Sequence, residues 1–134
     1  MDVKRREEII KFAQKLNSTN LSPLRSGNIS LKAQNNNKEG FLITPSGKKY
    51  DSLKADDIVF VSLKGNYDEK GLQPSSEWRF HKDIYLKKAD AKAVVHAHSP
   101  HATAVSAHNK DIPAFHYMIA LAGGDNIKLS LIHI

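Results

Sequence analysis

The chain has 134 residues, a formal net charge of +6 and no cysteine. A chain of this length folds as one domain with its own hydrophobic core, and the lack of cysteine excludes disulfides and thiolate metal sites and is typical of a reducing compartment, so we expect a cytoplasmic protein. The charged start MDVKRREEIIKF, and the absence of any apolar run near the roughly 18 residues that cross a bilayer, predict neither a signal peptide nor a membrane-spanning segment.

The positive charge is spread along the chain. Twenty lysines and arginines are interleaved with fourteen acidic residues, and no basic cluster alternates with aromatic residues or carries a nucleic-acid-binding signature. We therefore predict no nucleic-acid partner. Two interpretations of the charge remain: a solvated, lysine-rich surface, or a positive field that attracts a small anionic substrate, such as a phosphorylated one.

Helical and strand patterns alternate from the N-terminus. Apolar residues at helical spacing predict an amphipathic helix over residues 2–16, with Asp2 as a candidate cap. Three strands are expected next, over residues 29–33, 41–44 and 57–66, and the turn formers NNNKEG join the first two as a hairpin.

The second half of the chain continues the alternation. A helix is expected over about 76–88, then a strand in VVHAH, then a helix to about His108 that Ser99 caps and Pro100 starts. The apolar segment 112–124 fits a strand and a helix equally well. The mixture of helices and strands in this order indicates a layered α/β domain.

Two histidines one residue apart mark the end of the apolar run VVHAH. Alternate side chains of a strand share a face, so His96 and His98 are expected on one face with their side-chain origins roughly 7 Å apart. Two imidazoles at that spacing can both reach a Zn²⁺ ion. The alternative is a pair of hydrogen-bonded histidines at a strand end without any metal, and the spacing alone does not decide between them.

The segment QPSSEWRFH is the second candidate for a chemical role. Ser75 or Ser76 can cap the helix that follows, and a helix N-terminus with hydroxyls nearby is a natural anion site. Glu77 then falls in the first turn. It is either a solvated carboxylate near a cap or a catalytic base that faces the metal.

Two further turns can complete an anion site. Gly27 allows a close backbone approach beside the Asn28 amide, and Ser46 and Gly47 offer a hydroxyl and backbone N–H groups directly after a strand. Each turn alone is ordinary. Together with the histidine pair they favour a functional site.

The segments SGNIS, GFLITPSGKKYD, DIVFVSLKGN, PSSEWRFHKDIY, AVVHAHSPHATAVS and IPAFHYMIALAGGDNI, in this order, closely resemble the class II aldolase/adducin family. The resemblance runs from about residue 7 to Ile127. It implies that residues 1–134 form the N-terminal portion of a class II aldolase/adducin-like domain, a three-layer α/β/α fold with a mixed central β-sheet, incomplete at the C-terminus. It also implies a divalent zinc cofactor and a homotetramer with active sites between subunits.

The resemblance assigns roles to particular residues. His96 and His98 match two of the family's three zinc histidines, Glu77 matches the catalytic acid/base that also ligates the resting metal, and Tyr117 matches a tyrosine that reaches a neighbouring subunit's site. The residues that match the segments holding the substrate phosphate are Gly27, Asn28, Ser46, Gly47, Ser75 and Ser76.

The function implied by the resemblance is zinc-dependent cleavage of a ketose phosphate to dihydroxyacetone phosphate and an aldehyde through a metal-stabilised enediolate. Glutamate rather than aspartate after the paired serines favours aldol chemistry over epimerisation. The alternatives are a catalytically incomplete fragment and a non-catalytic, adducin-like interaction domain. Such interaction domains tend to lose the ligands that this chain keeps.

Two departures from the family pattern matter. Leu24, Arg25 and Ser26 stand where the aldolases usually carry Gly-Thr, so Arg25 is a candidate for recognising a different anion. The family's third zinc histidine lies in a later HG segment, and His133 is too early to replace it. We therefore expect a truncated or frame-disrupted member, with a natural short form as the alternative, that binds zinc weakly, has little activity alone and exposes apolar surface near residues 112–134.

Overall fold

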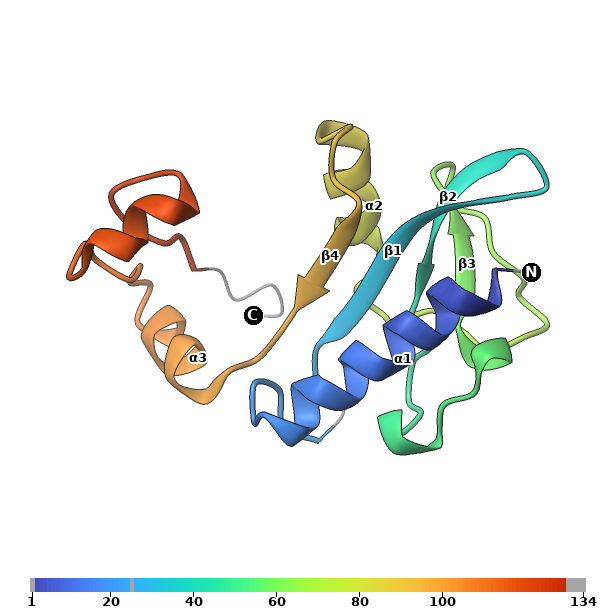
Figure 1. Ribbon diagram of the computed structural model, residues 1–134, viewed down its shortest axis with the longest axis horizontal. Helices are drawn as coiled ribbons and strands as arrows, with labels where there is room; N and C mark the ends of the chain where they lie inside the picture. Colours follow the sequence, from blue (N-terminus) through green and yellow to red (C-terminus); the bar gives the residue numbers. More distant parts are fainter. Residues whose placement is uncertain (1, 25, 130–134) are drawn as a thin grey trace. The chain divides into compact units, whose positions relative to one another are not determined.

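The structure is a computed structural model that describes residues 2–24 and 26–129, and it divides into two compact units, residues 1–97 and 98–134 (Figure 1). The first unit consists of helices around a β-sheet, which confirms the α/β class. None of the helices in the described part of the chain is both long and apolar enough to cross a membrane.

Helix α1 spans Val3–Ser18 and begins as the sequence predicts. The Asp2 carboxylate caps it by accepting a hydrogen bond from the backbone N–H of Arg5 at 3.2 Å. The apolar positions with helical spacing face inward, and Ile9 and Ala13 are fully buried.

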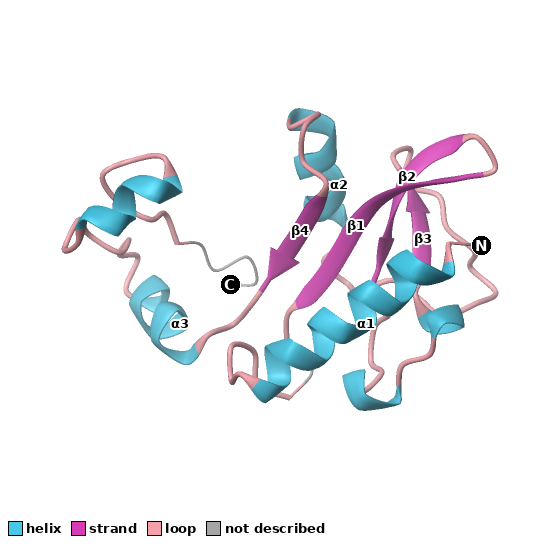
Figure 2. Cartoon of the chain, viewed as in Figure 1, coloured by secondary structure: helices cyan, strands magenta, loops and turns pink. Residues whose placement is uncertain are grey.

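The sheet of the first unit has the strand order β3-β2-β1-β4 (Figure 2). Its strands are β1 Asn28–Asn35, β2 Lys38–Ile43, β3 Val59–Ser62 and β4 Ala93–His96. The resemblance implied a mixed sheet, but all neighbouring strands in the described part pair antiparallel. The hairpin between β1 and β2 reverses the chain in two asparagines with left-handed φ angles, which this residue tolerates.

Two separate hydrophobic clusters cover the two faces of the sheet, which gives the three layers that the resemblance implied. Helix α1 packs on one face with Leu42 of β2, and helix α2, Trp78–Lys87, packs on the other with Phe41 and Ile43. The alternation of neighbouring β2 side chains between the clusters follows from the pleat of the strand.

The polar residues of β1 lie on the α2 face. Ser30 pairs with Ile43 on one side and with Val94 on the other, and both of these belong to the cluster under α2. Because directly paired residues share a face, Asn28 and its partner His96 also point towards α2. The sheet register therefore brings polar side chains of β1 and β4 to the start of this helix.

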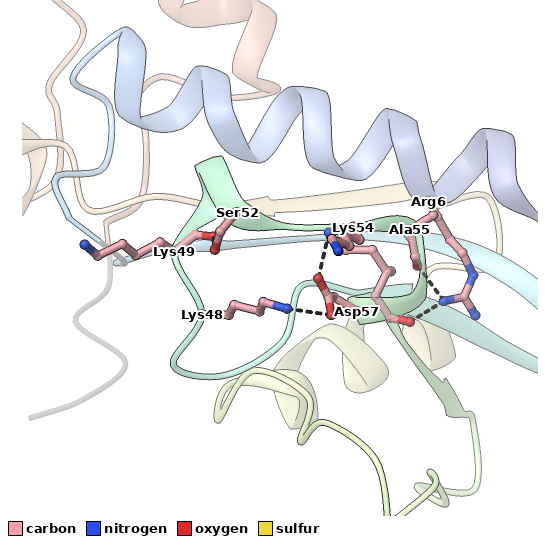
Figure 3. Close-up of polar contacts among 8 residues, drawn as sticks. Arg6, Lys48, Lys49, Ser52, Lys54, Ala55 and Asp57 are labelled. Carbon is pink, nitrogen blue, oxygen red and sulfur yellow. Dashed lines mark hydrogen bonds and ion pairs between the residues drawn. The ribbon is translucent and has the colours of Figure 1, made fainter.

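Short 3₁₀ helices at Tyr50–Ser52 and Ala55–Asp57 follow β2 and anchor its outgoing loop (Figure 3). The Arg6 guanidinium of α1 donates to the backbone carbonyl of Ala55 at 3.0 Å. The Asp57 carboxylate accepts from the Lys54 backbone N–H and pairs with the Lys48 ammonium at 2.7 Å. Burial raises the pKa of the Asp57 carboxyl, but these contacts outweigh it and hold the pKa below its usual value.

The second unit contains helix α3, Pro100–Ala107, and a 3₁₀ helix at Tyr117–Ala122. Pro100 is the first residue of α3, as predicted, although the Ser99 side chain makes no capping hydrogen bond. The apolar segment that fitted a strand and a helix equally well forms the 3₁₀ helix, and Ile112 pairs with Ile127 in an isolated antiparallel bridge.

Candidate metal and anion site

The Glu77 carboxylate lies at the N-terminus of α2, where Glu77 is the N-cap residue, and only 8% of the residue is exposed. The predicted alternative of a solvated carboxylate is therefore wrong. Its Oε1 atom is 3.3 Å from Nε2 of His96, the last residue of β4. That imidazole also packs edge-on against the ring of Phe80, with centroids 5.2 Å apart.

His98 stands two residues beyond the end of β4, so the expectation that strand alternation sets its direction is wrong. One ligand atom each of Glu77, His96 and His98 nevertheless lies within 4.8 Å of the other two. No other such group of three or more histidine, cysteine or acidic side chains occurs among residues 2–24 and 26–129.

The spacing of the Glu77 and His96 atoms suits a metal ion. Two ligands bound at 2.0–2.1 Å to one tetrahedral zinc lie about 3.3 Å apart, and the Oε1–Nε2 separation of Glu77 and His96 is 3.3 Å. A charge-assisted hydrogen bond between the same groups would be shorter, about 2.7–2.9 Å. Two imidazoles and a carboxylate also form a donor set that catalytic zinc sites use, with one position left for water or substrate.

Asn28 connects this group to the interior of the first unit. The residue is almost fully buried, and its side-chain Nδ2 donates a hydrogen bond to Oε2 of Glu77. Its Oδ1 lies 2.5 Å from Nε2 of His81. Both ends of the Asn28 amide are thus engaged by side chains of α2 and its cap. A role of this side chain as a phosphate ligand stays a prediction.

The turns predicted to hold phosphate come together within the first unit. Thr44 exchanges hydrogen bonds with the backbone of Ile29, and its carbonyl accepts from the Ser75 N–H at 3.0 Å. Ser46 donates its N–H to the Gln73 carbonyl at 2.9 Å. Thr44 therefore joins the strand that follows Gly27 to the segment that carries the paired serines.

The donors that face solvent in these turns differ from those expected. The Ser46 N–H is used within the fold, and the Ser75 hydroxyl accepts from the Glu77 N–H at 3.4 Å. Ser76 and Gly47 are exposed. The hydroxyls of Ser46 and Ser76 and the exposed backbone at Gly47 are the candidate anion donors, and binding of an anion there stays a prediction.

Gly27 occupies a position where no other residue fits. Its φ angle is +82°, and a Cβ atom there would lie 2.6 Å from the carbonyl oxygen of His96 and 2.6 Å from Oγ of Ser22. Its own carbonyl accepts a hydrogen bond from the Tyr50 hydroxyl at 2.6 Å. Burial, followed by the Glu77 charge, raises the pKa of Tyr50 to about 12, so the hydroxyl stays a donor.

Gly27→Ala is expected to lower the free energy of unfolding by about 3 kcal/mol, because the new methyl group combines a left-handed φ with backbone overlap. Gly47→Ala is the matched control: its φ is +74°, but nothing lies within 4 Å of the added Cβ. That change should cost only the conformational penalty, about 1–2 kcal/mol. Urea unfolding of both variants measures the difference, and equal losses would contradict the close approach at Gly27.

His81 is the residue that the sequence analysis missed. It lies one helical turn after Glu77, at the end of the segment QPSSEWRFH, and is fully buried. The signal that was available is the four-residue spacing, which places both side chains on one face of a helix. Burial, followed by the charge of His96, lowers the pKa of His81 to about 4.

This pKa predicts a loss of stability in mild acid. The unfolded chain takes up a proton at His81 near pH 6.5, but the folded chain does so only near pH 4, so acidification favours the unfolded state. The contribution, up to about 3 kcal/mol, is lost as the pH falls from about 7 to 4. Urea unfolding across this range should show a steeper pH dependence for the unchanged chain than for His81→Gln, and parallel curves would contradict the pKa.

Three residues discussed in the sequence analysis are not placed in the candidate site. Tyr117 belongs to the second unit, where its residue is 80% exposed and its ring packs on His116 with centroids 4.4 Å apart. Its role at a neighbouring subunit stays a prediction. Arg25 and His133 lie outside the described residues.

The profile of the class II aldolase and adducin N-terminal domain family matches residues 7–131. The chain therefore belongs to this family. Among curated proteins it is 46% identical over 120 residues to the L-fuculose phosphate aldolase of Escherichia coli K12, covering 90% of this chain and 54% of that protein.

A second curated relative has a different substrate in its name. The 5-methylthioribulose-1-phosphate/5-deoxyribulose-1-phosphate aldolase of Rhodospirillum rubrum is 41% identical over 124 residues, covering 92% of this chain and 54% of that protein. The chain thus spans about half the length of the curated relatives that it matches.

Solved structures agree with the family. An L-fuculose 1-phosphate aldolase superposes with a TM-score of 0.81 at 36% identity, covering 92% of this chain and 57% of that one. The L-fuculose-1-phosphate aldolase from Thermus thermophilus gives a TM-score of 0.72 at 27% identity, covering 89% of this chain and 59% of that one.

Proposed function

We propose that this chain provides the metal-binding and phosphate-binding part of an aldolase that cleaves a ketose 1-phosphate into dihydroxyacetone phosphate and an aldehyde. The observation that carries the proposal is the buried Glu77 carboxylate, whose Oε1 lies 3.3 Å from Nε2 of His96, a separation that allows both atoms to bind one metal ion. The same carboxylate lies beside the turns at Ser75 and Gly27. The similar proteins are named for L-fuculose phosphate and 5-methylthioribulose-1-phosphate, which are both ketose phosphates.

Glu77, His96 and His98 would hold the metal, and zinc is the ion proposed for them, because two imidazoles and one carboxylate are a donor set of catalytic zinc sites. A divalent ion bound there would act as a Lewis acid that polarises the substrate carbonyl. The residues themselves bind and orient the substrate and move its protons.

Glu77 is assigned the proton transfer at carbon. In the cleavage direction the C4 hydroxyl loses its proton, the C3–C4 bond breaks, and its electron pair passes towards the C2 carbonyl. C3 then takes a proton, which Glu77 delivers as a general acid and removes again in the reverse direction. The low exposure of this carboxylate keeps bulk water from competing for that proton.

The phosphate is assigned to the turns around Gly27, Ser46 and Ser75. Their adjacency through Thr44 supports one shared pocket, and donors from the exposed Gly47 and Ser76 would fix the phosphate and with it the reacting carbons. The net charge of +6 attracts such an anionic substrate.

Tyr117 is proposed to take the C4 hydroxyl proton within a homotetramer, where it would act in the site of a neighbouring subunit. The exposure of Tyr117 in the described residues supports this role, because the hydroxyl is accessible from outside its own unit.

A coupled assay for dihydroxyacetone phosphate tests the proposal with L-fuculose 1-phosphate and 5-methylthioribulose 1-phosphate in the presence of Zn²⁺. The assay is run on the 134-residue chain and on the same chain joined to the remaining half of the E. coli relative, because the chain covers 54% of that protein. We expect cleavage of at least one sugar by the joined protein and much slower turnover by the chain alone. A joined protein that folds and binds zinc but cleaves neither sugar would contradict the proposed function.

A further inference from the structure

A buried chain of polar side chains leads from the interior of the first unit to the Glu77 carboxylate. The Tyr85 hydroxyl lies 2.8 Å from Oγ of Ser30, which lies 2.7 Å from Nδ1 of His81. The other ring nitrogen of His81, Nε2, lies 2.5 Å from Oδ1 of Asn28, whose Nδ2 donates to Glu77. The first four of these five residues are at most 2% exposed.

The donor and the acceptor of every hydrogen bond in this series of side chains follow from its Glu77 end. An ionised carboxylate only accepts, so the Asn28 amide turns its NH₂ group to Glu77 and its oxygen to His81. Nε2 of His81 must then carry the ring proton and donate it to that oxygen. Nδ1 is left as an acceptor.

The hydrogen bonds at the Tyr85 end of the series are consistent with these donors and acceptors. Nδ1 of His81 accepts from the Ser30 hydroxyl, and the Ser30 oxygen in turn accepts from Tyr85. Burial keeps the His81 imidazole neutral around pH 7, because its pKa is lowered to about 4, so the ring has a single proton. Because Nδ1 accepts from Ser30, that single proton is on Nε2, where it is donated to Asn28.

His81 acts by selecting one of the two possible orientations of the Asn28 amide. The oxygen and the NH₂ group of an amide are nearly identical in size, so packing alone does not choose between the two orientations. The reversed orientation would place Oδ1 against the Glu77 carboxylate, two acceptors in a buried space, which is costly. A donor on the far side of the amide prevents the reversal.

We propose that His81 is a positioning residue for Glu77: its Nε2–H holds the Asn28 amide in the orientation that donates to the carboxylate. Glu77 is then fixed through Oε2, while Oε1 is directed towards His96. His81 is not a member of the candidate metal group, and its hydrogen bond reaches Glu77 through Asn28.

Nitrogen-15 NMR of the ring nitrogens tests the inference on the unchanged chain. Uniformly labelled protein at pH 7 should show His81 as the Nε2–H tautomer, with a ring N–H that exchanges slowly because the residue is fully buried. The resonance is assigned by its absence in His81→Gln. The Nδ1–H tautomer at this site would overturn the inference, whatever the activity of the protein.

Two substitutions separate positioning from simple packing. The amide nitrogen of glutamine reaches as far along the side chain as Nε2 of histidine, but that of asparagine reaches only as far as Nδ1. His81→Gln therefore keeps a donor for the Asn28 oxygen, and His81→Asn loses it. Zinc titration by calorimetry should show affinity within about 3-fold of the unchanged chain for His81→Gln and a loss of about 10-fold or more for His81→Asn.

Equal losses of zinc affinity in His81→Gln and His81→Asn would overturn the inference, since they would show that only the packing of the ring matters. If His81→Asn fails to fold, the tautomer of His81 in the unchanged chain still tests the inference. The importance of Glu77 orientation for catalysis rests on the proposed function. The tautomer of His81 and the zinc affinities of the variants can be measured independently of that function. Absence of aldol cleavage with the expected tautomer and zinc affinities would contradict the proposed function and leave the inference standing.

Discussion

Glu77→Gln is expected to lower the rate of hydrogen exchange at C3 of dihydroxyacetone phosphate by about 10²–10⁴-fold, the contribution of a positioned acid or base. Glutamine keeps the shape of the side chain and an acceptor for Asn28 but cannot take up or release the C3 proton. Incorporation of deuterium from D₂O, followed by proton NMR, measures this step without any aldehyde. The protein is the chain joined to the second half of the E. coli relative, with Zn²⁺ present.

The control for Glu77→Gln is Glu69→Gln, which removes an exposed carboxylate of a surface loop. The control should exchange deuterium at the unchanged rate. Exchange in Glu77→Gln within a few-fold of the unchanged protein would assign the proton transfer to another residue.

His96→Ala is expected to weaken zinc binding by more than about 100-fold, beyond the 10–100-fold effect of losing a residue that only orients a ligand. The substitution removes one ligand and leaves the Glu77 carboxylate and His98 as a two-residue donor set, one short of a catalytic zinc site. Calorimetric titration of the folded variant with Zn²⁺ measures the loss.

His108→Ala is the matched control for His96→Ala, because His108 is exposed at the end of α3 and is not a member of the candidate metal group. It should bind zinc as tightly as the unchanged chain. If His96→Ala and His108→Ala both leave the affinity unaltered, zinc binds elsewhere or not at all.

The regular elements could be predicted because their causes are local. Helical spacing of apolar residues and the Asp2 cap define α1, and alternation with turn-forming asparagines defines the β1–β2 hairpin. The apolar segment 112–124 could not be assigned, because a short apolar run suits a strand and a helix alike and because the isolated bridge pairs Ile112 with Ile127, which lies outside the segment.

The candidate site could be predicted only in part. The histidine pair and Glu77 carry recognisable spacing, but the end of β4 at His96 removed the alternation argument for His98. The engagement of Asn28 and His81 depends on sheet register and on the angle of α2, neither of which a single segment encodes. Buried polar networks of this kind emerge only when the elements have been packed together.

The most direct test of the account is zinc X-ray absorption of the zinc-loaded chain, because it counts the ligands of the bound ion. We expect nitrogen and oxygen neighbours at about 2.0–2.1 Å, with outer scattering from two imidazole rings for His96 and His98. Single substitution of either histidine by alanine should remove one ring from that signal. A bound zinc ion without imidazole scattering, or with a signal that neither substitution changes, would contradict the site.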